Sequence, residues 1–357
     1  MRILQLAPPW FTVPPTGYGG TEWVVAQLAD GLMEAGHDVT LLASGGSRTR
    51  ARLETVFDEP PSARLGEQWP DLLHALAGYR RAGEFDVIHD HSGIIGPAIG
   101  ALLSASGAAP PVVHTLHGPW HDDARLLYAA LPTPAQGGLH LVAISDDQAA
   151  RAPGGVHIDA VVHNGVPAER FRFRPEQRDG SGPLAFVGRA SPDKGPDAAV
   201  RVAAALGRPL RMAVKINEAP ERAYWDEVVA PLLADADVEV TFNATFAQKA
   251  AVMEEADVLL NPIVWPEPFG LVMAEAMACG TPVVSYALGA AGELVEHGRT
   301  GYLVEPGDFD GFCAAVARVG EIDPRACRRR VELHFSSEAM VDGYLRVYEK
   351  VLTRHFD

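Results

Sequence analysis

Apolar residues follow the same order twice along this chain: a short run, a polar or glycine-rich segment, and a stripe with helical spacing. In the first half, the run at 3–6 predicts a strand and the stripe at 24–32 predicts a helix. Gly36 stands where a helix-ending glycine is expected, and a second apolar run follows at 39–42. These elements predict a βαβ unit.

The same order restarts in mid-chain. A strand is predicted at 184–187, a loop at 188–195, a helix at 198–206 and a further strand at 210–214. Because strands that alternate with helices form parallel sheets, we expect an α/β protein with two Rossmann-like, doubly wound domains that face each other across a cleft. Ligands are expected at the carboxyl ends of the strands.

A charged segment between the two units sets the expected domain boundaries. It is poor in aliphatic residues and ends in turn residues, so we expect an N-terminal domain at 1–167, a linker at 168–182 and a C-terminal domain at 183–336. The last residues, 337–357, have helical periodicity, and we expect this helix to pack back on the first domain. A length of 357 residues agrees with two domains of about 150 residues each.

Composition narrows the possible partners and the compartment. The 46 acidic and 30 basic residues give a formal charge of −16, which argues against nucleic acid as a partner and gives no indication of membrane contact. A local basic patch could still bind one phosphorylated ligand. Three scattered cysteines argue against disulfides or a zinc site. Prolines make the first residues a poor signal peptide and divide the uncharged stretch 92–116, so we expect a cytoplasmic protein.

The segment 265–284, WPEPFGLVMAEAMACGTPVV, carries the strongest chemical pattern. It follows a predicted buried strand at 256–262. Glu267 is expected in the loop before a helix that Gly280 ends, and Glu275 is expected inside that helix. The N–H groups at the start of this helix predict an anion site, because they lack helical acceptors and lie at the positive end of the helix dipole. A carboxylate on each side could accept hydrogen bonds from diols.

This block resembles the signature of the retaining nucleotide-sugar glycosyltransferases of glycosyltransferase family 4, which have the GT-B fold. The resemblance covers nearly the whole chain. Further segments resemble that family's landmarks in order: its first glycine loop, its strand-end histidine motif, two later landmarks and its phosphate-clamp loop, which are residues 17–22, 114–118, 143–145, 163–166, 188–189 and 194–195. The resemblance implies an acceptor domain first and a nucleotide-sugar donor domain second.

The resemblance implies a role for each side chain at the reaction centre. Glu275 would accept the ribose hydroxyls of the nucleotide, and Glu267 would bind hydroxyls of the donor sugar near its anomeric carbon. Arg189 and Lys194 would neutralise the diphosphate leaving group. His117 would contact the donor sugar. Glu267, His117, Arg189 and Lys194 are therefore the expected catalytic residues.

Backbone groups complete the nucleotide-sugar site that the resemblance implies. Gly19 and Gly20 lack side chains, so the first domain's backbone could approach the diphosphate closely. Gly188 belongs to the phosphate-clamp loop. The amides that would hold sugar and phosphate oxygens are those of Phe269, Gly270, Leu271 and Val272.

We expect the reaction to need no metal and no cofactor besides its co-substrate. The donor is expected to be a UDP-sugar, with GDP, ADP and TDP as alternatives, and the acceptor to be a hydroxyl compound. Since no nucleophile is obvious, we favour a front-face mechanism in which the departing phosphate oxygen takes the acceptor proton. A double displacement with Glu267 as nucleophile is the alternative.

Several residues allow a second interpretation. The segment His89-Asp90-His91 could bind a metal, although these side chains more often line a cleft, and His91 could shape the acceptor side. His117 could be a structural histidine. Trp120 could stack on an acceptor sugar or simply pack. Glu22 could cap a helix or reach the acceptor.

Other functions also remain open at this point. A GT-B epimerase or phosphorylase and a non-transferring sugar-nucleotide binding module are the alternatives to a glycosyltransferase. A dehydrogenase is disfavoured, because GYGGTE lacks the GxGxxG spacing. The composition resembles that of bacteria with secondary metabolism and suggests antibiotic tailoring; synthesis of trehalose, sucrose or another glycan is open.

Overall fold

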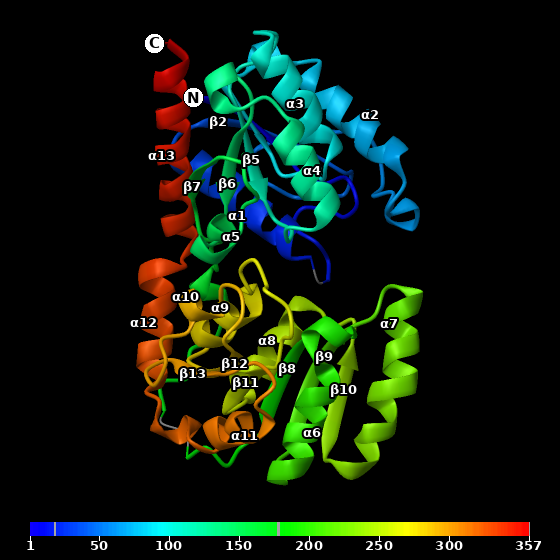
Figure 1. The fold of residues 1–357 in the computed structure, drawn as a ribbon, viewed down its shortest axis with the longest axis vertical. Helices are drawn as coiled ribbons and strands as arrows, with labels where there is room; N and C mark the ends of the chain where they lie inside the picture. The colour runs from blue at the N-terminus through cyan, green and yellow to red at the C-terminus, as the bar shows by residue number, and fades with distance from the viewer. Residues whose placement is uncertain (18, 177–178, 357) are drawn as a thin grey trace. The chain divides into compact units, whose positions relative to one another are not determined.

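The computed structural model describes residues 1–17, 19–176 and 179–356, with the side chains of 354–356 excepted. The chain forms two compact units (Figure 1). The first unit is residues 1–165 together with 337–357, and the second is residues 166–336. Within the described residues, no helix is both long and apolar enough to cross a bilayer.

The first unit is a parallel sheet of seven strands in the order β3-β2-β1-β4-β5-β6-β7. Strands β4 and β5 are buried along their whole length, as expected for a parallel sheet with helices on both faces. The elements of this unit are β1 (Arg2–Leu6), α1 (Gly20–Glu34), β2 (Asp38–Ala43), β3 (Arg52–Thr55), α2 (Gln68–Tyr79), β4 (Val87–Asp90), α3 (Ile95–Ala105), β5 (Val112–Leu116), α4 (Asp122–Ala130), β6 (His140–Ala143), α5 (Asp146–Ala150), β7 (Ile158–Val161) and α13 (Ser337–Phe356).

The second unit is a parallel sheet of six strands in the order β10-β9-β8-β11-β12-β13. Leu184, Phe186, Leu210 and Phe312 are among its fully buried side chains. Its elements are β8 (Leu184–Arg189), α6 (Pro196–Leu206), β9 (Leu210–Lys215), α7 (Ala219–Tyr224), β10 (Val238–Phe242), α8 (Phe246–Glu255), β11 (Val258–Asn261), α9 (Leu271–Ala278), β12 (Val283–Tyr286), α10 (Ala291–Leu294), β13 (Gly301–Val304), α11 (Phe309–Ala317) and α12 (Pro324–His334).

Each sheet contains one point at which the strand order reverses. In the first unit, consecutive strands run outward from β1 to β3 before the chain crosses to β4 on the other side of β1. In the second unit, the same reversal separates β8 from β11. Loops diverge at such a point and leave room for a ligand at the carboxyl ends of the strands. The expected pair of doubly wound domains is confirmed.

The final helix α13 is an integral part of the first unit. A Cβ on Gly31 of α1 would lie 2.5 Å from Cγ2 of Val341, so the absence of a side chain lets the two helices approach closely. Gly343 makes a similar approach to Val162. Ser337, at the start of α13, also hydrogen-bonds Gln27 of α1.

The segment 168–182, expected as a linker, belongs to the second unit; Gln177 and Arg178 within it lie outside the described residues. Its apolar residues Ala168 and Phe171 are buried. Arg328 of α12 donates to the carbonyl oxygens of both, at 2.7 and 3.3 Å. The change of unit therefore falls at 165–166, and the chain returns to the first unit at 336–337.

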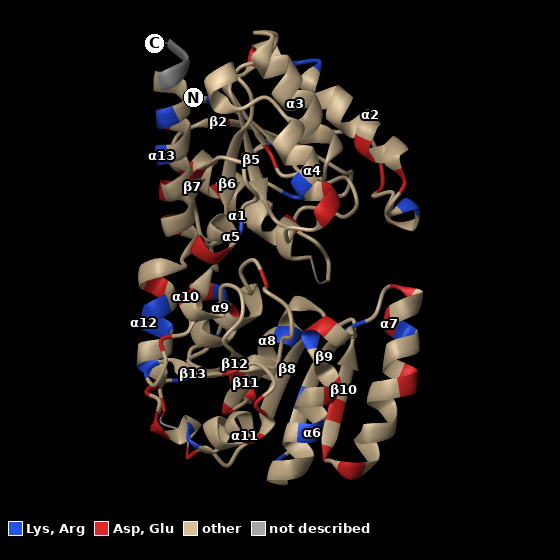
Figure 2. Cartoon of the chain, viewed as in Figure 1, with Lys and Arg blue, Asp and Glu red and all other residues tan. Residues whose placement is uncertain are grey.

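Charged residues of both signs are interspersed on each unit (Figure 2). Helix α12 carries a cluster of arginines, but several of these donate to carbonyl oxygens of the chain itself. Arg325 donates to Pro175, Arg328 to Ala278, and Arg330 to Leu294. The cluster therefore stabilises the second unit's own loops.

Candidate functional site

In the second unit, three loops at the carboxyl ends of the strands bring the predicted residues together. The loop after β8 contains Lys194, and the loop after β11 contains Glu267. Val264 N–H donates to the carbonyl oxygen of Asp193 at 3.0 Å, which ties the first two loops together. Ala290 N–H donates to the carbonyl oxygen of Glu267 at 3.0 Å, which ties the second loop to the loop after β12.

Lys194 and Glu267 form an ion pair. The Lys194 ammonium lies 2.5 Å from Oε1 of Glu267, and the side chains are 12% and 20% exposed. The same ammonium lies 5.0 Å from the ring centroid of Trp265, a cation–π contact. The indole N–H of Trp265 is a buried donor with no partner in the described part of the chain. Positive charge and an available donor thus lie next to Glu267.

Glu275 is held by a lysine that the sequence analysis did not single out. The Lys249 ammonium, on α8, lies 2.6 and 2.7 Å from the two carboxylate oxygens of Glu275, and both side chains are almost nine-tenths buried. A carboxylate has about four acceptor positions, so Glu275 can accept further hydrogen bonds beside this pair. Lys249 and Ala250 are both buried in α8, but a single lysine beside apolar residues gives no sequence signal that points to Glu275.

Arg189 ends β8 and lies near two carboxylates. Its guanidinium is 3.3 Å from Oδ2 of Asp193 and 3.4 Å from Oε1 of Glu221, and its side chain is 39% exposed. Glu221 is itself buried and accepts from the N–H of Asn217 at 2.8 Å. Arg189 is therefore held on one side while part of its guanidinium faces solvent.

Glycines shape the start of α9 and the loops around it. Gly270 caps the helix with a φ of +93°, which favours glycine, and Leu271 and Val272 lie in the first turn, where no helical carbonyl precedes their N–H groups. The side chain of Phe269 is buried and packs edge-on against Phe335. Gly188 belongs to β8, where a Cβ would lie 3.1 Å from the Phe186 ring.

In the first unit, the predicted glycines lie at the start of α1. Gly19 is the residue before the helix and is buried, and a Cβ there would lie 2.7 Å from Oε2 of Glu22 and 3.0 Å from Pro15. Gly20 is the first residue of the helix, and Glu22 lies buried in its first turn. Tyr18 of this glycine loop lies outside the described residues.

His117 follows β5 and lies against His91, which follows β4. Nε2 of His117 is 2.9 Å from Nδ1 of His91. Burial lowers the pKa of the His117 imidazole to about 3, so the ring is neutral near pH 7. Trp120 donates its indole N–H to the carbonyl oxygen of Gln148 and packs edge-on against Tyr128. These contacts agree with a packing role for Trp120.

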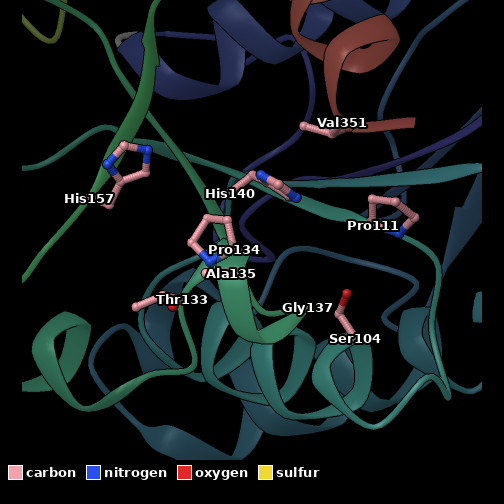
Figure 3. A pocket seen from close by; sticks show the side chains of 9 residues that line it. All are labelled: Ser104, Pro111, Thr133, Pro134, Ala135, Gly137, His140, His157 and Val351. Carbon is pink, nitrogen blue, oxygen red and sulfur yellow. The ribbon is translucent and has the colours of Figure 1, made fainter. Parts of the chain in front are cut away.

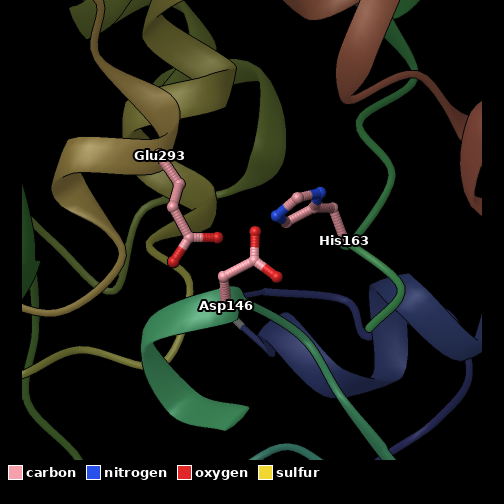
Figure 4. A group of neighbouring side chains, drawn as sticks. All are labelled: Asp146, His163 and Glu293. Atoms are coloured by element: carbon pink, nitrogen blue, oxygen red, sulfur yellow. The ribbon is translucent and has the colours of Figure 1, made fainter. Parts of the chain in front are cut away.

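The segment His89-Asp90-His91 is bonded to protein groups. His89 contacts Tyr348 and Thr115, and Asp90 accepts from the hydroxyl of Tyr79 at 2.7 Å. A second candidate for metal binding in the first unit is the pair Asp146 and His163, whose possible ligand atoms lie within 4.8 Å of each other (Figure 4). Figure 4 also draws Glu293, which belongs to the second unit. Two ligands are fewer than a protein metal site usually supplies.

A cavity of about 510 Å³ in the first unit lies at the other end of the sheet (Figure 3). Pro111 directly precedes β5 and His140 begins β6, and both line this cavity. It therefore opens at the amino ends of strands whose carboxyl ends carry His117. The predicted site residues are not part of this cavity.

The sequence of both units matches known glycosyltransferases. Residues 18–170 match the model of the family described as Glycosyltransferase Family 4, and residues 168–332 match that of Glycosyl transferases group 1. A D-inositol 3-phosphate glycosyltransferase of Pseudarthrobacter chlorophenolicus is 30% identical, over 80% of this chain and 78% of that protein. A phosphatidyl-myo-inositol mannosyltransferase of Mycolicibacterium smegmatis is 30% identical, over 98% of this chain and 94% of that protein.

Among solved structures, AviGT4, a glycosyltransferase involved in avilamycin A biosynthesis, superposes with a TM-score of 0.73 at 27% identity, over 99% of this chain and 98% of that chain. Fold, motif and relatives together define a glycosyltransferase of the GT-B type. The chain belongs to glycosyltransferase family 4.

Replacement of Lys249 by Met should destabilise the second unit. The substitution leaves the buried Glu275 carboxylate without its partner, and we expect the free energy of unfolding to fall by about 3 kcal/mol. Replacement of Glu275 by Gln in the same chain should recover part of this loss, because the uncompensated charge is removed. Chemical denaturation of the two single variants and the double variant measures this coupling; strictly additive losses would contradict it.

Replacement of Gly289 by Ala should impair the placement of Glu267. Gly289 has a φ of +55°, and a Cβ there would lie 2.4 Å from both the backbone N and the O of Glu267. We expect the rate of sugar transfer to fall about 100-fold, the effect of a displacement of about 1 Å at a reaction centre. Gly292→Ala is the matched control, since its Cβ would meet open space in α10. Equal activities in the two variants would refute the prediction.

Proposed function

We propose that this glycosyltransferase moves a sugar from a nucleoside diphosphate donor, with UDP as the expected nucleotide, to an acceptor hydroxyl with retention of the anomeric configuration. The observation that carries the proposal is a pair of carboxylates, each matched to its own lysine. Lys194 pairs with Glu267 before α9, and Lys249 pairs with Glu275 inside it. Glu267, Glu275 and Lys194 stand at the positions for which the resemblance implies a role.

The donor domain is assigned to the second unit. Glu275 accepts hydrogen bonds from the ribose hydroxyls, and Lys249 keeps the Glu275 carboxylate oriented. Arg189, Lys194 and the first-turn amides of α9 attract the diphosphate, because they combine two cations with unpaired N–H groups. Glu267 binds hydroxyls of the donor sugar, and His117 is proposed to contact a sugar hydroxyl, as the resemblance implies.

The reaction follows a front-face course in this proposal. The bond between the anomeric carbon and the diphosphate oxygen breaks, and the acceptor oxygen bonds to the same carbon from the same face. The acceptor proton passes to the departing phosphate oxygen. Negative charge grows on the diphosphate as the bond breaks, so Lys194 and Arg189 stabilise the transition state more than the bound substrate.

The similar proteins support a proposal for the pathway and for the acceptor class. The similarity to AviGT4 supports a role in antibiotic or oligosaccharide biosynthesis, and the two inositol-linked relatives support a polyol acceptor. An acceptor panel that contains an inositol phosphate and an oligosaccharide separates these two classes. The proposed location is the cytoplasm, where nucleotide sugars are available.

The configuration of the product tests the proposal. A calorimetric screen of UDP, GDP, ADP and TDP first selects the nucleotide, and we expect UDP to bind most tightly. An α-linked donor sugar should then give an α-linked product, which proton NMR of the fresh product shows. An inverted product would overturn the retaining assignment, and nucleotide binding without transfer to any acceptor would favour a binding module.

Mass spectrometry of the wild-type protein with donor and a slow acceptor separates the two retaining routes. The front-face route predicts an unmodified chain. A glycosyl adduct on Glu267 would establish the double displacement instead.

Removal of metal ions should leave transfer unchanged. In the proposed site, Arg189 and Lys194 supply the positive charge that a divalent cation supplies elsewhere. An Asp-x-Asp segment can hold such a cation, and the chain has two. Asp235-Ala236-Asp237 precedes β10, at the amino end of that strand, and in Asp308-Phe309-Asp310, after β13, Asp308 caps α11 by accepting from the N–H of Gly311. We expect equal rates before and after treatment with EDTA. A large loss that Mn²⁺ or Mg²⁺ restores would refute metal independence.

A further inference from the structure

A chain of buried hydrogen bonds leads from His117 to the last helix of the first unit. Nε2 of His117 lies 2.9 Å from Nδ1 of His91, whose Nε2 lies 2.7 Å from Oε1 of Gln5 on β1. The Gln5 amide nitrogen donates to the hydroxyl of Tyr348 on α13 at 3.0 Å. That hydroxyl lies 2.6 Å from Nδ1 of His89. Gln5, His89, His91 and Tyr348 are at most 2% exposed.

The amide oxygen of Gln5 determines which atoms donate in the bonds between Gln5, His91 and His117. An amide oxygen only accepts, so Nε2 of His91 carries a proton that it donates to Gln5. Burial lowers the pKa of His91 well below its usual range and that of His117 to about 3, so each neutral ring has one N–H. Nδ1 of His91 therefore accepts from Nε2–H of His117. Nδ1 of His117 is left without a proton.

The Gln5 amide, in the orientation that it has in the structure, sets the donor and acceptor roles along the rest of the network. Its N–H donates to Tyr348, whose hydroxyl in turn donates to Nδ1 of His89. Nε2 of His89 then donates to Oγ1 of Thr115 at 2.7 Å. Turning the Gln5 amide by 180° would exchange donor and acceptor at each bond of this path and would place the His117 proton on Nδ1, so the tautomer of His117 reports the orientation of this amide.

We propose that Gln5, His91 and Tyr348 are positioning residues that hold His117 in the tautomer with a proton on Nε2, so that Nδ1 accepts a hydrogen bond from a hydroxyl of the sugar substrate. The tautomer follows from the hydrogen bonds of the first unit alone. Its use toward a sugar hydroxyl rests on the function proposed above. The final helix thereby supports a site residue more than 200 positions earlier in the sequence.

Nitrogen NMR tests the tautomer directly. The full chain, labelled with ¹⁵N-histidine, is examined near pH 7 by long-range proton–nitrogen correlation, and His117→Gln identifies the resonances of His117. We expect a protonated Nε2 and an unprotonated Nδ1. A protonated Nδ1, which corresponds to the turned Gln5 amide, or averaged nitrogens would overturn the proposal. This measurement needs no turnover, so it stands even if the proposed transfer reaction fails.

Two tyrosines of α13 provide a matched pair of variants. Tyr348→Phe removes the hydroxyl that orients Gln5, whereas Tyr344→Phe removes one that contacts only Thr115 on this network. We expect Tyr348→Phe to give averaged His117 nitrogens and to lower kcat/KM about tenfold, as for other partners that orient functional histidines. Tyr344→Phe should change neither.

A third variant guards against a general loss of structure. Gln5→Met keeps the size of the side chain but removes both hydrogen bonds, and it should give the same averaged nitrogens as Tyr348→Phe. Thermal unfolding of each variant, followed by circular dichroism, serves as the control for folding of the first unit, to which Gln5 and Tyr348 belong. His117 nitrogens that match the wild type in both Gln5→Met and Tyr348→Phe would overturn the positioning role.

Discussion

The fold depends on one constraint: a parallel sheet with helices on both faces can carry polar side chains economically only at its strand ends. Along β4, β5 and β8 nearly every residue is buried, so polar groups there must be paired within the protein. In both sheets, polar side chains gather at the strand ends where the strand order reverses. In the second unit Arg189 ends β8, and Lys194 and Glu267 lie in the loops after strands; in the first unit His91 and His117 directly follow β4 and β5.

The exceptions show what the constraint demands. Gln5 and His89 lie opposite each other inside the first sheet, as neighbours in the register of β1 and β4. Neither can reach water, so Tyr348 of α13 supplies a hydrogen-bond partner to both. These hydrogen bonds help to hold residues 337–357 in the first unit, whose other residues are 1–165. The helix completes a polar network as well as an apolar core.

The two doubly wound domains could be predicted from the sequence, because the spacing of apolar residues and the glycines in turns are local signals. The restart near residue 184 predicted two like domains, and the family block placed Glu267 before a helix and Glu275 within it, as the structure has them. The linker at 168–182 was a poorer inference, since its charges concealed Ala168 and Phe171, which pack into the second unit.

Partners that depend on strand order could not be predicted in the same way. Lys249 pairs with a carboxylate 26 positions away, and Gln5 reaches His91 only because β1 and β4 are neighbours. A polar residue in an apolar strand signals that a partner exists without saying which. Local pattern therefore identifies candidate site residues, whereas the residues that pair with them are known only from the fold.

The net charge of −16 has a further consequence for an enzyme proposed to bind a diphosphate. Carboxylates of the chain itself lie against the cations of the candidate site: Glu267 pairs with Lys194, and Asp193 and Glu221 lie beside Arg189. A diphosphate must therefore exchange partners with these carboxylates rather than enter an open positive patch. In the proposed reaction, Lys194 would turn to the diphosphate, and Glu267 would then be released to bind sugar hydroxyls. In that proposal the Lys194–Glu267 ion pair would couple recognition of the leaving group to recognition of the sugar, and the complete donor would be favoured over either part alone.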